Sequence, residues 1–118
     1  MRTFAAFILC QTARNAVCAT TRDDGRIGLP GGKVDVDESP VQTAIREAHE
    51  EGWAVDGVDS TPIHRAIVDG KPVVWFRATS ATRLADYKEK TRGIRPVIVT
   101  VDTVRRSGFG NENLPFTG

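Results

Sequence analysis

Residues 29–54 read LPGGKVDVDESPVQTAIREAHEEGWA, which predicts a glycine-containing loop followed by one helix. The start of this helix has an N-cap, a first-turn proline and a capping-box partner in the required order: Ser39, Pro40 and Gln42. The helix can continue to Glu51, after which Gly52 ends it. At about 100° per residue the apolar side chains form one stripe, which we expect to pack on a sheet: Val41, Ala44, Ile45 and Ala48.

The same helix carries Glu47, Glu50 and Glu51 on one flank near its C-terminal end. Carboxylates three and four residues apart are neighbours, and each pair repels by roughly a few tenths of a kcal/mol. Negative charge at this end also opposes the helix dipole. Two interpretations follow. The cluster is either a solvated acidic face, which is the common case, or a site for a hard cation such as Mg²⁺ or Mn²⁺, which prefers carboxylate oxygens.

The residues before this cluster favour the cation site. Gly32 is followed after five residues by Glu38, after seven more by Arg46-Glu47, and after two more by Glu50-Glu51. This order resembles the Nudix box, G-x5-E-x7-R-E-U-x-E-E-x-G-U, in which U is a bulky aliphatic residue. The preceding Leu29-Pro30-Gly31 is also typical of that family.

Two positions depart from the box. Ala48 is smaller than the usual residue at its position, which a close contact between helix and sheet would tolerate. Gly52 follows Glu51 directly, so that either Trp53 replaces the usual glycine or one residue has been deleted. Both departures leave the spacing of Glu47, Glu50 and Glu51 unchanged.

The resemblance implies roles for the residues of the box. Carboxylates at the positions of Glu47, Glu50 and Glu51 bind Mg²⁺ or Mn²⁺ in the family, and a backbone carbonyl, here that of Gly31, adds an oxygen ligand. An arginine at the position of Arg46 orients a catalytic glutamate, for which a guanidinium is suited. The remaining two matched residues, Gly32 and Glu38, support the loop or the metal shell.

Hydrolysis also needs a carboxylate that accepts a proton from the attacking water. In the Nudix family this general base is either a glutamate of the box, here Glu47, or one from a later loop. Glu89 and Glu112 are the loop candidates, and the sequence leaves the three open.

Two aromatic side chains outside the box are candidates for substrate binding. Trp75 lies in a predicted strand beside Phe76, so the two rings point to opposite faces, and one of them could stack on a base. His64 lies in the preceding predicted strand. For both Trp75 and His64 the alternative is a purely structural role.

The rest of the chain predicts mainly β-structure. Strands over residues 4–10 and 16–21 are expected to form a hairpin around 11–15, and a short strand follows the turn at 23–25. A second hairpin is expected from 63–68 and 72–79, and residues 80–93 look irregular. A last strand over 94–101 contains Pro96, which favours an edge or a bulge, and Asp102 is expected to cap a short helix. This order predicts an α/β (α+β) sandwich, with one principal helix on a mixed sheet, in a single domain over residues 1–118.

Composition restricts the partners. The formal net charge of +1 argues against binding of polymeric nucleic acid, and no apolar run approaches the length of a membrane span. Cys10 and Cys18 are too few for a disulfide scaffold and are expected to be buried thiols in a reducing compartment. We therefore expect a cytoplasmic protein, monomeric or homodimeric.

The resemblance implies a Mg²⁺- or Mn²⁺-dependent hydrolase that cleaves the pyrophosphate bond of a nucleoside diphosphate derivative, a small-molecule nucleotide. The chain is close to the family's minimal size and has no spare N-terminal segment, which favours a nucleoside triphosphate over ADP-ribose, dinucleotides or nucleotide sugars. The alternatives are a non-catalytic nucleotide-sensing module on the same fold and a structural protein with a solvated acidic helix. An intact acidic cluster argues against the sensing module.

Overall fold

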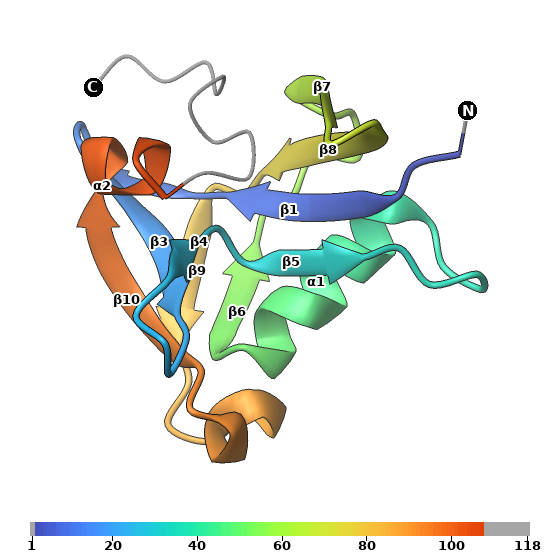
Figure 1. Cartoon of the computed structure of the whole chain (residues 1–118). Coiled ribbons are helices and arrows are strands. Elements are labelled where there is room, and N and C mark those ends of the chain that lie inside the picture. Colours follow the sequence, from blue (N-terminus) through green and yellow to red (C-terminus); the bar gives the residue numbers. More distant parts are fainter. Residues whose placement is uncertain (1, 108–118) are drawn as a thin grey trace.

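The strand β1 (Ala5–Leu9) separates two hydrophobic cores, because its side chains alternate between the two faces of its sheet. Ala5 and Leu9 pack in one core, and Ala6 and Ile8 pack in the other. The computed structural model describes residues 2–107. Figure 1 shows β1 crossing the middle of the molecule, with the long helix on one side of it.

The sheet that contains β1 has four strands in the order β5-β1-β8-β7. Its other members are β5 (Gly31–Lys33), β7 (His64–Val68) and β8 (Lys71–Arg77). β1 runs parallel to β8, and the other two pairs are antiparallel, so the sheet is mixed as expected. The predicted second hairpin is β7-β8, and both of its turn residues, Asp69 and Gly70, have positive φ.

A second sheet has the order β10-β3-β2, with β4 also paired to β3. Its strands are β2 (Gln11–Ala13), β3 (Ala16–Thr21), β4 (Ile27–Gly28) and β10 (Arg95–Thr100). β10 lies at the edge, which is where a proline such as Pro96 is tolerated. A third pair joins β6 (Trp53–Asp56) to β9 (Ser80–Arg83).

The principal helix, α1, spans Pro40–Glu50 and begins as the sequence predicts. The Ser39 hydroxyl accepts from the Gln42 amide at 3.3 Å, and the Gln42 side chain accepts from the Ser39 amide at 2.9 Å. α1 packs against β1, β5 and β6, and Ala44 and Ala48 are fully buried there. The expected stripe is wrong at Ile45, which is 38% exposed, whereas Thr43 is buried.

The altered end of the box still ends α1 at a glycine. Gly52 itself adopts the positive φ (+105°) that ends the helix, and Trp53 starts β6 with its ring buried. A Cβ at Gly52 would lie 2.7 Å from the Pro96 ring, so β10 closes on this turn. The Trp53 indole N–H donates to the Ala19 carbonyl at 2.8 Å, which links the turn to β3.

The structure corrects the first predicted hairpin. β1 and β3 do not pair; the chain leaves β1 at Cys10 and forms β2, which pairs with β3 in the second sheet. The loop expected at Gly31-Gly32 is largely strand, because β5 pairs antiparallel with β1. β6 and β9 are short strands that pair only with each other, so local pattern alone did not predict them.

Two short helical segments complete the described chain: η1 (Lys88–Arg92), a 3₁₀ turn, and α2 (Val101–Arg105). The cap of α2 is Thr100 rather than the expected Asp102, since the Thr100 hydroxyl accepts from the Thr103 amide at 3.2 Å. Cys10 and Cys18 are buried free thiols, as expected. None of the helices within residues 2–107 has the length and apolar character needed to cross a bilayer.

Candidate active site

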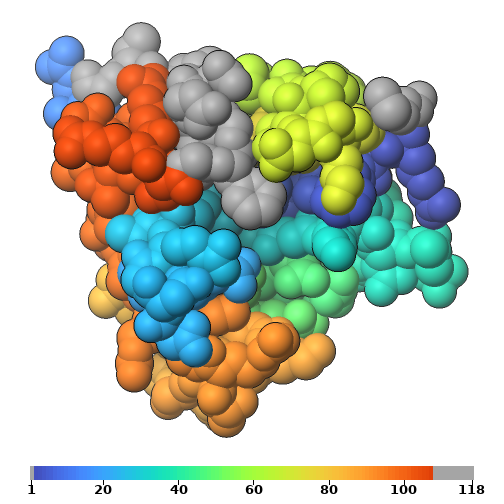
Figure 2. All heavy atoms as spheres, in the orientation of Figure 1, coloured from blue at the N-terminus to red at the C-terminus, as the bar shows by residue number. Residues whose placement is uncertain are grey.

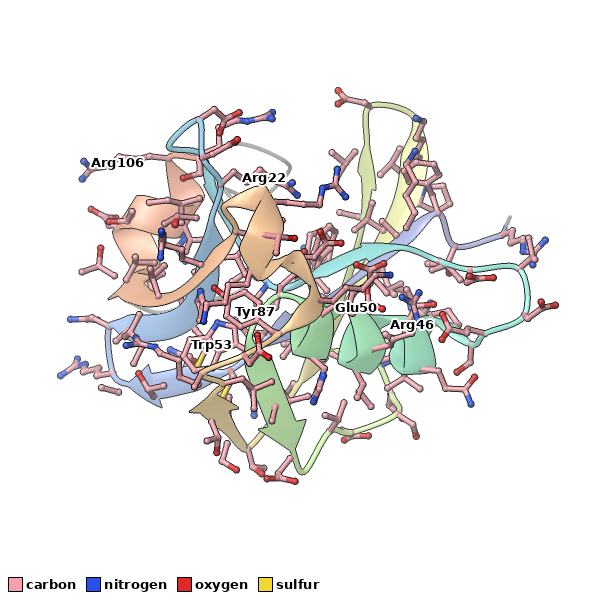
Figure 3. All side chains as sticks on the ribbon, turned by 90° about the horizontal axis from the view of Figure 1, so that it is seen from below. Arg22, Arg46, Glu50, Trp53, Tyr87 and Arg106 are labelled. Carbon is pink, nitrogen blue, oxygen red and sulfur yellow. The ribbon has the colours of Figure 1, made fainter. Side chains whose placement is uncertain are left out.

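Arg46 is the centre of an ion-pair network on the outer flank of α1. Its Nε and Nη2 donate to the two carboxylate oxygens of Glu38 at 2.8 and 2.9 Å. Its Nη1 lies 3.0 Å from Glu50 Oε2 and 3.5 Å from Glu47 Oε1. Figure 3 shows Arg46 and Glu50 together on α1. The expected orienting role is thus directed first at Glu38 and Glu50 rather than at one glutamate.

Glu38 is also held by a buried hydroxyl, which the sequence did not single out. The Thr43 hydroxyl donates to Glu38 Oε1 at 2.9 Å, and its oxygen accepts from the Asp35 amide at 3.3 Å. The Arg46 guanidinium, and then the Thr43 hydroxyl, keep the pKa of Glu38 below its ordinary value. Glu38 therefore anchors the loop before α1 to the helix flank.

Glu51 lies in a contrasting environment at the C-cap of α1. Its residue exposure is only 5%, and its Oε1 accepts from the Gly31 amide at 3.0 Å. Burial raises the pKa of Glu51 from 4.5 to about 8, against the opposing effect of the Gly31 hydrogen bond. The charge of Glu47 raises it further. Gly31 thus contributes its amide to Glu51, and its carbonyl stays a predicted cation ligand.

Glu47 lies against the second glycine of the pair. A Cβ at Gly32 would lie 2.9 Å from the Glu47 carboxyl carbon, so a larger residue there would displace this side chain from its position. Burial, and then the neighbouring charge of Glu50, raise the pKa of Glu47. The two adjacent glycines thus contact two different glutamates: Gly31 through its amide and Gly32 through the space beside it.

A cavity of about 800 Å³ opens next to these carboxylates. Glu47, Glu51, Gly31 and Gly32 line it, and so does Glu89 of η1, the segment that contacts α1. Figure 2 shows this face, where the light-blue turn after β3 adjoins the orange segment that contains η1. The other lining side chains include apolar, cationic, acidic and hydroxyl groups: Phe4, Phe7, Ile27, Leu29, Ile94, Arg22, Arg26, Lys33, Arg92, Asp23, Asp24, Thr20 and Ser107.

Two of the three general-base candidates thus belong to the cavity. Glu89 faces it from η1 and is paired with Arg92 at 3.4 Å. Glu47 faces it from α1. Glu112 lies outside the described residues.

Trp75 and His64 lie behind the cavity rather than along it. They are cross-strand neighbours with ring centroids 5.1 Å apart, and Trp75 is fully buried. Phe7, which is paired with Trp75 in the sheet and stacked on it at 6.1 Å, lines the cavity instead. Neither Trp75 Nε1 nor His64 Nε2 has a hydrogen-bond partner within residues 2–107.

The acidic side chains fit a hard divalent cation by their chemistry. Glu47 and Glu51 are desolvated carboxylates whose pKa values are raised by burial and by neighbouring glutamates, Glu50 and Glu47 respectively, a penalty that bound positive charge would reverse. Their present side-chain positions do not converge: within residues 2–107, no three His, Cys, Asp or Glu side chains meet as a cation site. The reason is that Glu50 turns toward Arg46 and Lys88, and Glu51 toward Gly31.

Sequence reasoning missed several residues of this region. Arg22, Arg92 and Phe7 line the cavity, and Lys88 lies 3.8 Å from Glu50. Phe7 comes from β1, Arg22 from the turn after β3, and Lys88 and Arg92 from η1, so no spacing rule linked them to the box. Only their charge and their position after strands could have suggested them.

Comparisons with known proteins agree with this arrangement. No curated protein sequence matches the chain. One similar solved structure comes from work on MutT of Aliivibrio salmonicida and Vibrio cholerae, with 22% identity over 98% of this chain and 93% of that chain and a TM-score of 0.69. A second, the MutT protein of Bacillus halodurans, has 20% identity over 92% of this chain and 75% of that chain, with a TM-score of 0.61. These two likenesses show a shared fold, which confirms the predicted fold class.

The family itself is shown by sequence. The family model described as the NUDIX domain matches residues 1–107, which include the whole box and every strand of the three sheets. The chain therefore belongs to the Nudix family of hydrolases.

Proposed function

We propose that this Nudix hydrolase uses Mg²⁺ or Mn²⁺ to cleave the pyrophosphate bond of a nucleoside diphosphate derivative, within a single catalytic domain. The observation that carries the proposal is the row of buried or half-buried carboxylates, Glu47, Glu51 and Glu89, at one end of a cavity of about 800 Å³. This volume is in the range of roughly 300–1,000 Å³ that is usual for small-molecule sites.

The proposed cation ligands are Glu47, Glu50 and Glu51, with the Gly31 carbonyl. A bound divalent cation would neutralise the phosphate oxygens and acidify a water molecule. Arg46 holds the flank in place, because its bonds to Glu38 and Glu50 tie the loop before α1 to the helix. Glu38 and Gly32 are supporting residues in this proposal.

We assign the proton-accepting role to Glu89. It lines the same cavity as Glu47 and Glu51 but comes from η1 rather than α1, and it lies 3.4 Å from Arg92. Glu47, the alternative, is packed against Gly32 and lies 3.5 Å from Arg46 among the proposed ligands. A base from η1 leaves Glu47, Glu50 and Glu51 free to hold the cation.

On the substrate side, Phe7 is the ring that we expect to contact the base. Trp75 is stacked behind it and His64 lies behind Trp75, so these two are proposed to support the ring rather than to bind directly. The cations along the cavity, among them Arg22 and Lys33, suit a substrate with several negative charges. A nucleoside triphosphate is therefore the proposed substrate, acted on by a cytoplasmic monomer or homodimer.

A substrate panel with Mg²⁺ tests the proposal. Nucleoside triphosphates, ADP-ribose, dinucleotides and nucleotide sugars are incubated with the enzyme, and phosphate, pyrophosphate and nucleoside monophosphate are resolved. We expect a nucleoside monophosphate and pyrophosphate from a triphosphate, and no product in excess EDTA or with Glu50→Gln. Binding of nucleotides without turnover of any of them would instead indicate the sensing module.

A further inference from the structure

Glu50 is held by two cations on the same oxygen atom. Glu50 Oε2 lies 3.0 Å from Arg46 Nη1 and 3.8 Å from Lys88 Nζ. The Glu50 side chain is only 17% exposed, whereas that of Lys88 is 70% exposed. Lys88 therefore reaches from solvent toward a nearly buried carboxylate on α1.

The two cations differ in how firmly they are held. Arg46 also has two short hydrogen bonds to Glu38, so it cannot leave Glu50 without breaking the flank of α1. Lys88 Nζ has no hydrogen bond and no second ion pair within residues 2–107. Its flexible stem allows the ammonium to change partners at little cost in contacts.

The backbone around Lys88 is nevertheless held in position by hydrogen bonds. The Tyr87 hydroxyl donates to the Ile94 carbonyl at 2.7 Å, and Lys90 Nζ donates to the Ala85 carbonyl at 2.8 Å. These bonds close the segment around η1 on itself, and η1 packs on α1. Figure 3 shows Tyr87 at the start of this segment, beside α1. The segment thus presents the Lys88 ammonium at the edge of the carboxylate cluster.

We propose that Lys88 is a binding residue for the pyrophosphate group of the substrate. It pairs with Glu50 before ligands bind and transfers to a phosphate oxygen when a divalent cation takes Glu50. A cation at Glu50 repels the ammonium, and the phosphate that arrives with it offers a stronger partner. The inference rests on the proposed function, because it places pyrophosphate at the carboxylate cluster.

Lys88→Met, which keeps the length and removes the charge, is the informative variant. Lys88→Arg keeps the charge, and Arg14→Met removes one positive charge from the exposed turn before β3, outside the cavity. Two affinities are measured on each full-length protein: that for Mn²⁺ alone, and that for inorganic pyrophosphate in the presence of Mn²⁺.

We expect the two affinities of Lys88→Met to change in opposite directions. Pyrophosphate should bind about 10-fold more weakly, since one charge-assisted bond is lost. Mn²⁺ alone should bind about threefold more tightly, because a competing charge has left Glu50. Lys88→Arg should restore pyrophosphate binding, and Arg14→Met should match the parent in both. In turnover, KM should rise in Lys88→Met more than kcat falls.

Three results would overturn the inference: an unchanged pyrophosphate affinity in Lys88→Met, weaker Mn²⁺ binding in that variant, or a parent that does not bind pyrophosphate with Mn²⁺. Weaker Mn²⁺ binding would mean that Lys88 only orders Glu50. The proposed function fails separately, if the parent turns over no member of the nucleotide panel. If the parent hydrolyses triphosphates and Lys88→Met keeps the parental KM and affinities, the proposed function stands. Only the role of Lys88 is then contradicted.

Discussion

Glu38 and Glu51 belong to the same Nudix box but lie in opposite electrostatic environments. Glu38 is paired with Arg46 through two bonds, and its pKa is lowered. Glu51 is buried, its carboxylate accepts from the Gly31 amide, and its pKa is raised to about 8. At the start of the box, the charge of Glu38 is thus neutralised by Arg46 of the same chain. At the end of the box, we expect the charge of Glu51 to be neutralised by a bound ligand.

Glu50 connects these two regions. It is paired with Arg46 and Lys88 on the flank, but it lies on α1 between Glu47 and Glu51. From this difference we expect the Arg46 network to hold the site in shape, and Glu47 and Glu51 to bind the cation. The two regions can be disrupted one at a time by substitution.

The largest effect is expected from Glu51→Gln. Turnover should fall at least about 100-fold, because the variant loses a proposed cation ligand where charge develops at phosphorus. The neutral amide can still accept from Gly31, so folding should be preserved. Metal-free melting at pH 9 should show the variant to be more stable than the parent, since a buried charge is removed. Wild-type turnover would show that Glu51 has only a structural role.

Arg46→Lys is expected to break the other region, with a loss of about 10- to 100-fold in turnover. Lys cannot keep both bonds to Glu38 together with that to Glu50. Mn²⁺ affinity should fall less than in Glu51→Gln, because Arg46 is not itself a ligand. Steady-state kinetics and Mn²⁺ titration measure the two effects. A variant with near-parental rates would reduce Arg46 to a surface charge.

The pH dependence should distinguish the two regions without mutation. Glu51 holds its proton up to about pH 8 in the native state but loses it near its ordinary pKa of 4.5 when unfolded. The native state therefore binds more protons between these values, and the metal-free free energy of unfolding should fall as pH rises from about 4.5 to 8. Mn²⁺ affinity should rise over the upper part of the same range and level off above it. Both trends should disappear in Glu51→Gln; if they persist there, another group is responsible.

The smallest effect is expected from Thr43→Val, which removes the hydroxyl between Glu38 and Asp35. Glu38 keeps Arg46, so we expect a loss of about 1 kcal/mol in the free energy of unfolding and little change in turnover. Thr12→Val on the exposed strand β2 is the control, and chemical denaturation is the measurement. A large loss of turnover would place Thr43 in the machinery that holds the cation.

The site was predictable from sequence where its residues share one helix. The spacing of Arg46, Glu47, Glu50 and Glu51 along α1 determines which side chains are neighbours, since helix geometry is local. The capping box was predictable for the same reason. Ile45 was misassigned because the apolar stripe predicts which face is buried but not how far the sheet beneath it extends.

The strand pairing was less predictable. β1 and β3 lie next to each other in sequence and have suitable patterns, but β1 instead pairs in parallel with the distant β8. Parallel pairing needs a long connection, which no local pattern records. Glu89 was a candidate by residue type alone, and its position in the same cavity as Glu47 depends on how η1 packs on α1.

By itself, the sequence determined the family, the helix and the order of charges along it, because these depend on residues within a few turns of one another. Only the tertiary structure decided which charges are neutralised. Burial and the hydrogen bond from the Gly31 amide separate Glu51 from Glu38, although both are glutamates of one motif. Desolvation depends on everything packed around a group, and that information is distributed over β1, β5 and η1 rather than carried by any one segment.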